Sequence, residues 1–117
     1  MLEIVPVGAF KDNYVWTLRS GRLAAVVDPG DARPVLEYLE REGLELSAIL
    51  ATHHHADHVG GIAELRRHRD VPVYGPRGEP IPTLTQPVSG GDTVTLPEFG
   101  VTFEVIDIPG HTRAHIA

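Results

Sequence analysis

Four of the seven histidines of this chain lie between positions 53 and 58, directly after a mostly apolar segment. The segment Ser47–Thr52 has the hydrophobic pattern of a buried strand, and it leads straight into His53-His54-His55-Ala56-Asp57-His58. Imidazole and carboxylate side chains are common metal ligands. The sequence therefore predicts a sheet protein that carries a metal centre where one of its buried strands ends.

The spacing of the histidines indicates which of them can converge on one ion. In an extended chain, residues i and i+2 point to the same side and lie roughly 6.6–6.8 Å apart along the strand. His53 and His55 share a side on this basis, whereas His54 points away. The chain must then turn, and that turn can aim Asp57 and His58 at a neighbouring point.

The combination of several imidazole nitrogens with one carboxylate suits Zn²⁺, with Fe or Mn as alternatives. A distant histidine, His111, follows Pro109-Gly110 after another predicted strand and could complete a three-histidine site. The pair Gly60-Gly61 would let the backbone turn tightly beside the ions.

The competing interpretation is that these histidines form a solvated loop that binds metal only adventitiously. The internal position of the cluster, the buried strand before it and the offset of Asp57 favour the metal site. For His54 we expect an exposed position between two ligands. His68 lies among arginines and is expected on the solvated face of a helix, whereas His115 is undecided between support of the site and ordinary packing.

The remaining pattern indicates a layered α/β protein, because strands alternate with helices before a final strand pair. Asp31 can cap the first helix, Gly43 can end it, and Val35, Leu36 and Leu39 would form its inner face. Strands are predicted at 14–18, 23–27, 47–52, 71–74, 93–96 and 101–106, helices at about 33–42 and 61–69, and a loop at 75–91.

Composition excludes several classes of function. The chain has no cysteine, which excludes disulfides, thiolate nucleophiles and Cys-ligated metals and agrees with a cytoplasmic protein. Ten basic against sixteen acidic side chains give a net charge of −6 without a basic tract, so no nucleic-acid partner is expected. No apolar stretch approaches the about 20 residues of a membrane-spanning helix, and the first residues lack the pattern of a secretory signal, so no membrane partner is expected.

Three segments carry a resemblance to a known superfamily. Thr52 and the histidine cluster after it resemble the HxHxDH motif of the metallo-β-lactamase fold superfamily. Val27-Asp28-Pro29-Gly30 and Pro109-Gly110-His111-Thr112 resemble two further motifs of that superfamily, in the usual order. Lys11-Asp12-Asn13-Tyr14-Val15-Trp16, with Val27–Ala32, makes the chain similar to the glyoxalase II (hydroxyacylglutathione hydrolase) family.

The resemblance runs over essentially the whole chain but covers only the first half of a typical family member. It implies an α/β fold, the αββα sandwich of the metallo-β-lactamases, of which residues 1–117 form the N-terminal part. The C-terminal half and a helical substrate domain are absent from this sequence. The groups that hold glutathione would lie beyond residue 117.

The resemblance also implies roles for single residues. His53, His55 and His111 match the ligands of one metal ion, and Asp57 and His58 match two ligands of a second. Asp57 is thus the candidate catalytic residue, as a metal ligand and a local proton acceptor. Asp28 matches a carboxylate that does not bind the metal itself but orients the residues that do.

Two departures from the family pattern bear on these roles. Ala114 stands where glycine is expected, and the bridging aspartate and last histidine of the family lie beyond the end of this chain. Asp92 and Asp107 do not lie in the bridging motif and are not proposed as substitutes.

The implied reaction is hydrolysis of the thioester S-D-lactoylglutathione to D-lactate and glutathione, which serves methylglyoxal detoxification. A thiolate is a good leaving group, because the free thiol has a pKa of about 8.5, so strong general-acid help is unnecessary. This agrees with the lack of an evident Ser-His or Cys-His nucleophile in the sequence.

Three alternatives stay open. The chain could belong to another enzyme of the same fold, such as a persulfide dioxygenase with a single iron or a lactonase. It could be a metal-binding but non-catalytic domain, or a fragment without independent function. For the glyoxalase II interpretation, we expect the 117 residues alone to bind metal and to be a poor thioesterase, whereas the extended form is the hydrolase. The open sheet edge after the last strand would favour self-association.

Overall fold

The computed structural model describes residues 2–9, 13–53, 59–78, 80–81, 83–108 and 116. In chain order the elements are β1 (Glu3–Ala9), β2 (Asn13–Ser20), β3 (Leu23–Val27), α1 (Ala32–Glu42), β4 (Glu45–Leu50), α3 (Ile62–His68), β5 (Val73–Pro76), β6 (Gln86–Val88), β7 (Thr93–Leu96), the 3₁₀ turn η1 (Pro97–Phe99) and β8 (Val101–Glu104). None of the helices in this described part is long and apolar enough to cross a membrane.

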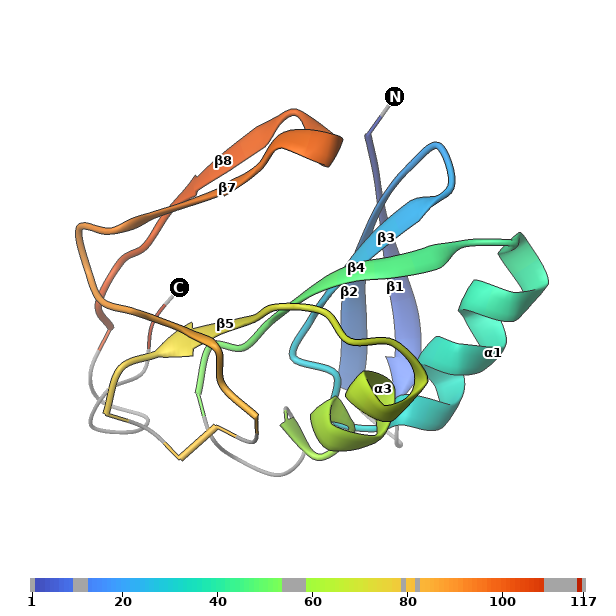
Figure 1. The fold of residues 1–117 in the computed structure, drawn as a ribbon, viewed down its shortest axis with the longest axis horizontal. Coiled ribbons are helices and arrows are strands. Elements are labelled where there is room, and N and C mark those ends of the chain that lie inside the picture. The colour runs from blue at the N-terminus through green and yellow to red at the C-terminus, as the bar shows by residue number, and fades with distance from the viewer. Residues whose placement is uncertain are drawn as a thin grey trace.

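A six-stranded sheet with the order β1-β2-β3-β4-β5-β6 forms the centre of the molecule, and β7 and β8 form a separate antiparallel pair (Figure 1). The pairs β1–β2 and β2–β3 are antiparallel, whereas the pairs β3–β4, β4–β5 and β5–β6 are parallel. Parallel neighbours require a crossover, and α1 and α3 lie in the first two of these connections. The carboxyl ends of β3 and β4 therefore lie at the same edge of the sheet.

The molecule has three layers, because each face of the central sheet packs against a different partner. Figure 1 shows α1 and α3 on one side of the sheet and the β7–β8 pair on the other. The helix-side core contains Val35 of α1 and Ile62 of α3 with Ile49 of β4. The core between the sheets joins Ala48 of β4 to Val94 of β7. Helix, sheet and sheet are the first three layers of the αββα sandwich, so the predicted fold class is confirmed.

The first helix forms as predicted because its ends carry strong capping residues. The Asp31 side chain accepts a hydrogen bond from the Arg33 backbone N–H at 3.1 Å, which satisfies a donor of the first turn. Gly43 ends the helix at φ 66°, a left-handed conformation that favours glycine. Val35 and Leu39 are buried as expected, and Tyr38, which was not placed on the inner face, is buried as well.

Two strands were missed by the sequence analysis. The strand β1 was not predicted, and Pro6 within it is tolerated because β1 is an edge strand that pairs only with β2. The strand β6, Gln86–Val88, lies inside the segment 75–91 that was predicted as loop. It contains Pro87 and gains its strand character from parallel pairing with β5, which is a long-range contact.

Candidate metal centre

The carboxyl ends of β3 and β4 bring two of the predicted site residues together. The last residues of these parallel strands, Val27 and Leu50, are paired in the sheet. Asp28 follows directly, and its backbone N–H donates to the Leu50 carbonyl at 2.7 Å, which extends the pairing by one residue. His53 lies three residues beyond Leu50. Strand pairing therefore places Asp28 at the base of the histidine segment.

Asp28 holds an unusual backbone conformation, and its carboxylate lies against Thr52, two residues beyond the end of β4. Its φ of 51° lies in the left-handed region, which Asp and Asn tolerate better than most residues. Asp28 Oδ1 accepts a hydrogen bond from the Thr52 backbone N–H at 2.7 Å, and Oδ2 accepts one from Thr52 Oγ1 at 2.7 Å. A strained conformation that is held by two short contacts is typical of residues with a positioning role.

His53 is the predicted ligand whose surroundings the structure describes. Its side chain is only 3% exposed, and its Nδ1 lies 2.9 Å from Thr52 Oγ1. Its Nε2 is also buried. A hydrogen bond at one ring nitrogen is the usual way in which proteins orient a histidine whose other nitrogen binds a metal ion.

Two backbone contacts tie other segments to the same region. The Gly61 N–H donates to the Pro29 carbonyl at 2.8 Å, which joins the start of α3 to the loop after β3. The Ile116 N–H donates to the Thr52 carbonyl at 3.0 Å, and Ile116 also forms a bridge with Asp107. The residues that flank segments 54–58 and 109–115 are thereby anchored near Asp28.

Several predicted site residues lie outside the described residues, namely His54, His55, Asp57, His58, His111 and His115. Within the ranges that the structure does describe, no group of three or more His, Cys, Asp or Glu side chains could hold a metal ion.

His68 is exposed at the end of α3, as predicted. Asp92 and Asp107 accept hydrogen bonds from the backbone N–H groups of Ser89 and Gly90, respectively.

Thr52 is the residue at this site to which the sequence analysis gave no role. The signal in the sequence was a hydroxyl side chain directly before the first predicted ligand. Its importance depends on the facing carboxylate of Asp28, which only the parallel pairing of β3 and β4 brings within reach.

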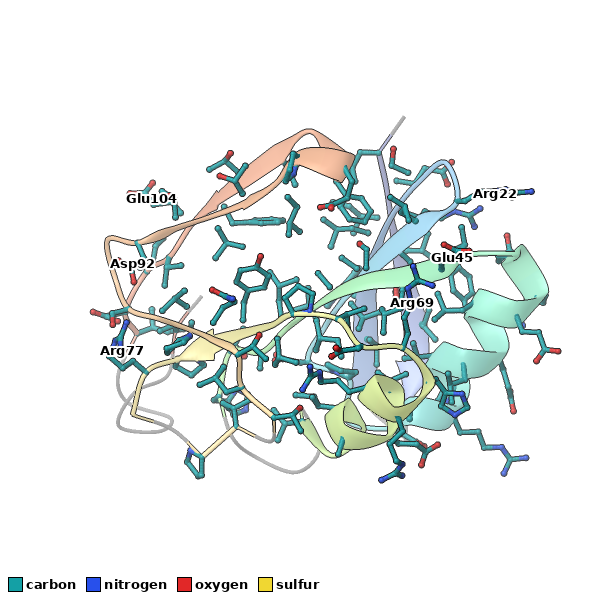
Figure 2. The ribbon with its side chains drawn as sticks, viewed as in Figure 1. Arg22, Glu45, Arg69, Arg77, Asp92 and Glu104 are labelled. Atoms are coloured by element: carbon teal, nitrogen blue, oxygen red, sulfur yellow. The ribbon has the colours of Figure 1, made fainter. Side chains whose placement is uncertain are left out.

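Charged contacts gather at the opposite end of β4. Arg69, which follows α3, lies 3.5 Å from Glu45 at the start of β4, and Figure 2 shows the two side chains close together there. The candidate centre lies beyond Leu50 at the other end of that strand. The ion pair at Glu45 is therefore a contact between elements and is remote from the histidines.

Comparison with known proteins places these observations in a family. The family model of the metallo-beta-lactamase superfamily matches residues 10–117. The hydroxyacylglutathione hydrolase of Nitrosomonas eutropha is 51% identical over 117 residues, which are 100% of this chain and 46% of that protein. Hydroxyacylglutathione hydrolase 2 of Vibrio vulnificus is 55% identical over 118 residues, with 99% and 46% covered.

The chain thus spans about half the length of the curated relatives that it matches. Among solved structures, the BLEG-1 B3 metallo-beta-lactamase superposes with a TM-score of 0.77 at 27% identity, over 99% of this chain and 65% of that one. With a family match that covers nearly the whole sequence and a fold that agrees with it, this chain belongs to the metallo-β-lactamase superfamily.

Proposed function

We propose that residues 1–117 are the N-terminal, metal-binding part of a hydroxyacylglutathione hydrolase. The substrate would be a glutathione thioester, S-D-lactoylglutathione, and the reaction would serve methylglyoxal detoxification. The relatives that share about half of their aligned residues with this chain carry that enzyme name. The structural observation that carries the proposal is the Asp28 carboxylate held against Thr52, with the buried His53 beside it.

The donor chemistry of the proposed ligands fits a zinc ion. His53, His55 and His111 would hold one ion, and Asp57 and His58 would contribute to a second. Imidazole nitrogen and carboxylate oxygen are donors that Zn²⁺ accepts readily, and Fe or Mn could use the same set. The buried, oriented ring of His53 is the arrangement that such a ligand needs.

The contacts of Ile116 support the inclusion of His111 in this set. Its backbone bond to Thr52 returns the end of the chain to the residue next to His53. Its bridge to Asp107 holds together the two sides of the segment that contains His111. The two described residues that bound this segment are therefore paired with each other, and one of them contacts Thr52.

The residues of this chain would orient the reaction. The chemistry that a bound divalent ion supplies is Lewis-acid polarisation of a carbonyl and a lowered pKa of water. Asp57 would accept a proton as water adds to the thioester carbonyl carbon. The C–S bond then breaks, and glutathione leaves as a thiolate that needs no strong general acid. Asp28 and Thr52 would keep His53 in place throughout.

The proposal also covers the part of the relatives that this chain does not span. We infer that this additional part of the sequence carries the remaining metal ligands and a helical glutathione-binding domain. We place the enzyme in the cytoplasm, in agreement with a chain free of cysteine. Neither nucleic acid nor membrane is proposed as a partner.

Zinc binding and turnover together test this proposal. We expect the 117-residue chain to bind zinc in equilibrium dialysis, and His53→Ala to lower the stoichiometry or affinity. The matched control is His68→Ala, which removes an exposed histidine on α3 and should bind zinc like the wild type. Equal binding by wild type, His53→Ala and His68→Ala would contradict the site.

The enzymatic part compares this chain with a version extended to the length of its relatives. We expect S-D-lactoylglutathione turnover by the extended protein and at most weak turnover by the 117 residues, since lost substrate positioning alone can cost orders of magnitude in rate. An extended protein that consumes oxygen with a persulfide substrate, or opens a lactone, and leaves the thioester intact would replace the proposed reaction. Comparable thioester turnover by both lengths would show that this half suffices.

A further inference from the structure

Thr52 lies between Asp28 and His53 at the candidate metal centre and contacts both of them. Its Oγ1 lies 2.7 Å from Asp28 Oδ2 and 2.9 Å from His53 Nδ1. Its backbone N–H donates to the other oxygen of Asp28, also at 2.7 Å. All three residues belong to the described part of the chain, and their contacts have the lengths of ordinary hydrogen bonds.

The number of available protons decides that direction. An ionised carboxylate only accepts hydrogen bonds, and both oxygens of Asp28 do so here. The Thr52 hydroxyl has a single proton, which it donates to Asp28. Its oxygen then faces His53 with lone pairs, so the His53 contact is a hydrogen bond only if the ring nitrogen Nδ1 carries a proton. The neutral ring then has its lone pair on Nε2.

We propose that Thr52 is a positioning residue that selects the Nδ1–H tautomer of His53 and so presents Nε2 for coordination. The inference rests on the proposed function, since it takes His53 as a metal ligand. A neutral imidazole can carry its proton on either nitrogen, and a metal ion binds the nitrogen without it. Asp28 acts through Thr52, because its carboxylate accepts the hydrogen bond of the Thr52 hydroxyl. That hydroxyl therefore cannot donate to the His53 ring.

Two substitutions at Thr52 separate the hydroxyl from the shape of the side chain. Thr52→Val keeps the branched shape and removes the hydroxyl, whereas Thr52→Ser keeps the hydroxyl and serves as the matched control. We expect zinc affinity to fall about 10–100-fold in Thr52→Val, as it does when a partner of a metal-bound histidine is lost. Thr52→Ser should retain affinity close to that of the wild type.

Asp28→Asn offers a sharper test, because it reverses the chain of hydrogen bonds without removing a side chain. The amide oxygen must stay at the Thr52 N–H, so the amide NH₂ faces Thr52 Oγ1 and donates to it. The hydroxyl proton then points to His53 Nδ1, which must accept. The ring proton moves to Nε2, and we expect zinc affinity to fall about 10–100-fold.

Nitrogen NMR of the ¹⁵N-labelled 117-residue chain reads the tautomer directly, without metal and at mildly alkaline pH. We expect Nδ1–H for His53 in the wild type and Thr52→Ser, and Nε2–H in Asp28→Asn. Zinc alone is the probe in the parallel affinity measurement. Circular dichroism of each variant shows whether it folds, and if Thr52→Val does not, Asp28→Asn and Thr52→Ser decide the question.

The tautomer and the affinity separate failure of this inference from failure of the proposed function. An Nε2–H ring in the wild type, or an unchanged Nδ1–H ring in Asp28→Asn, would overturn the role of Thr52. Unaltered zinc affinity in both folded variants would overturn it too. A wild-type chain that has the Nδ1–H tautomer but binds no zinc would uphold the hydrogen-bond chain and reject the proposed metal centre.

Discussion

At the residue scale, Gly61 shows how closely the elements around the candidate centre approach one another. A Cβ atom at this position would lie 2.5 Å from the Ala32 backbone nitrogen and 2.7 Å from the Pro29 carbonyl oxygen. Both are backbone atoms that cannot swing aside. The glycine is therefore needed for space between α3 and the loop after β3, whereas the sequence analysis had invoked its conformational freedom. Its φ of −93° is open to any residue.

We expect Gly61→Ala to lower the free energy of unfolding by about 1–3 kcal/mol, because the added methyl group forces these backbones apart. The control is Gly8→Ala in β1, where the added Cβ meets nothing within 4 Å, so stability should stay within about 0.5 kcal/mol of the wild type. Urea denaturation of the three proteins measures both effects. If Gly61→Ala unfolds at the wild-type midpoint, the close packing described here is wrong.

At the scale of elements, a small network joins β2 to α1 on the side away from the candidate centre. Arg19 of β2 donates to the Tyr38 hydroxyl at 2.9 Å and to Glu42 at 2.8 Å. Arg19 and Arg41 also lie over the Tyr38 ring, 5.9 and 5.5 Å from its centre. The hydrogen bond from Arg19 holds the pKa of Glu42 below the ordinary glutamate value of 4.5, and the same contact raises the pKa of Arg19.

The lowered pKa of Glu42 makes this contact sensitive to acid. Its contribution to stability is fully present above the ordinary carboxyl pKa and is lost as the pH falls through the lowered value of the folded state. We expect Glu42→Gln to lower Tm at neutral pH and to match the wild type in strong acid. The effect should be modest and weaker in salt, because the pair faces solvent.

Glu37→Gln on the same helix is the matched control, because its ion pair with Arg33 joins side chains that are 63% and 84% exposed. It should leave Tm unchanged at every pH. A gap between Glu42→Gln and the wild type that stays constant down to strong acid would show that the charge of Glu42 is not the cause.

At the scale of the whole molecule, the β7–β8 pair covers only part of the sheet face that lies opposite the helices. Leu18 of β2 is buried on this face, but Trp16 is 49% exposed and Ile4, the partner of Leu18 in β1, is 63% exposed. An apolar cavity of about 180 Å³ also remains between the two sheets, next to Leu50 and Thr52. Exposed apolar patches of this kind promote association.

We expect the 117-residue chain to self-associate as its concentration rises, through this face and the open sheet edges. Ile4→Lys should shift the sedimentation profile towards monomer, because it places a charge on the exposed face. Thr95→Lys on β7, a threonine that is already exposed, adds the same charge elsewhere and serves as the control. A wild-type chain that remains monomeric at high concentration would contradict the prediction.

Local patterns predicted the elements whose signals are short-range. The apolar segment Leu23–Val27 is a strand with the predicted bounds, and Asp31 and Gly43 limit the first helix as expected. The patterns failed for β6, because it is a strand only through pairing with β5. They also left Tyr38 off the inner face, although it is part of the helix-side core and its hydroxyl accepts a hydrogen bond from Arg19 of β2. Sequence alone does not reveal such long-range partners.

The sequence by itself determined the chemistry that this chain can offer. A cluster of histidines with one aspartate after a buried strand, in a chain free of cysteine, restricts the ligands to imidazole and carboxylate. The three motifs and their order along the chain, which need no structure to be seen, also indicated the superfamily. What only the tertiary structure decided is the set of contacts around His53, the one member of the cluster that the structure describes. Parallel pairing of β3 with β4 brings the Asp28 carboxylate onto Thr52, whose hydroxyl oxygen lies 2.9 Å from His53 Nδ1. The direction of a hydrogen bond depends on which group stands opposite, and that neighbour is supplied by the fold.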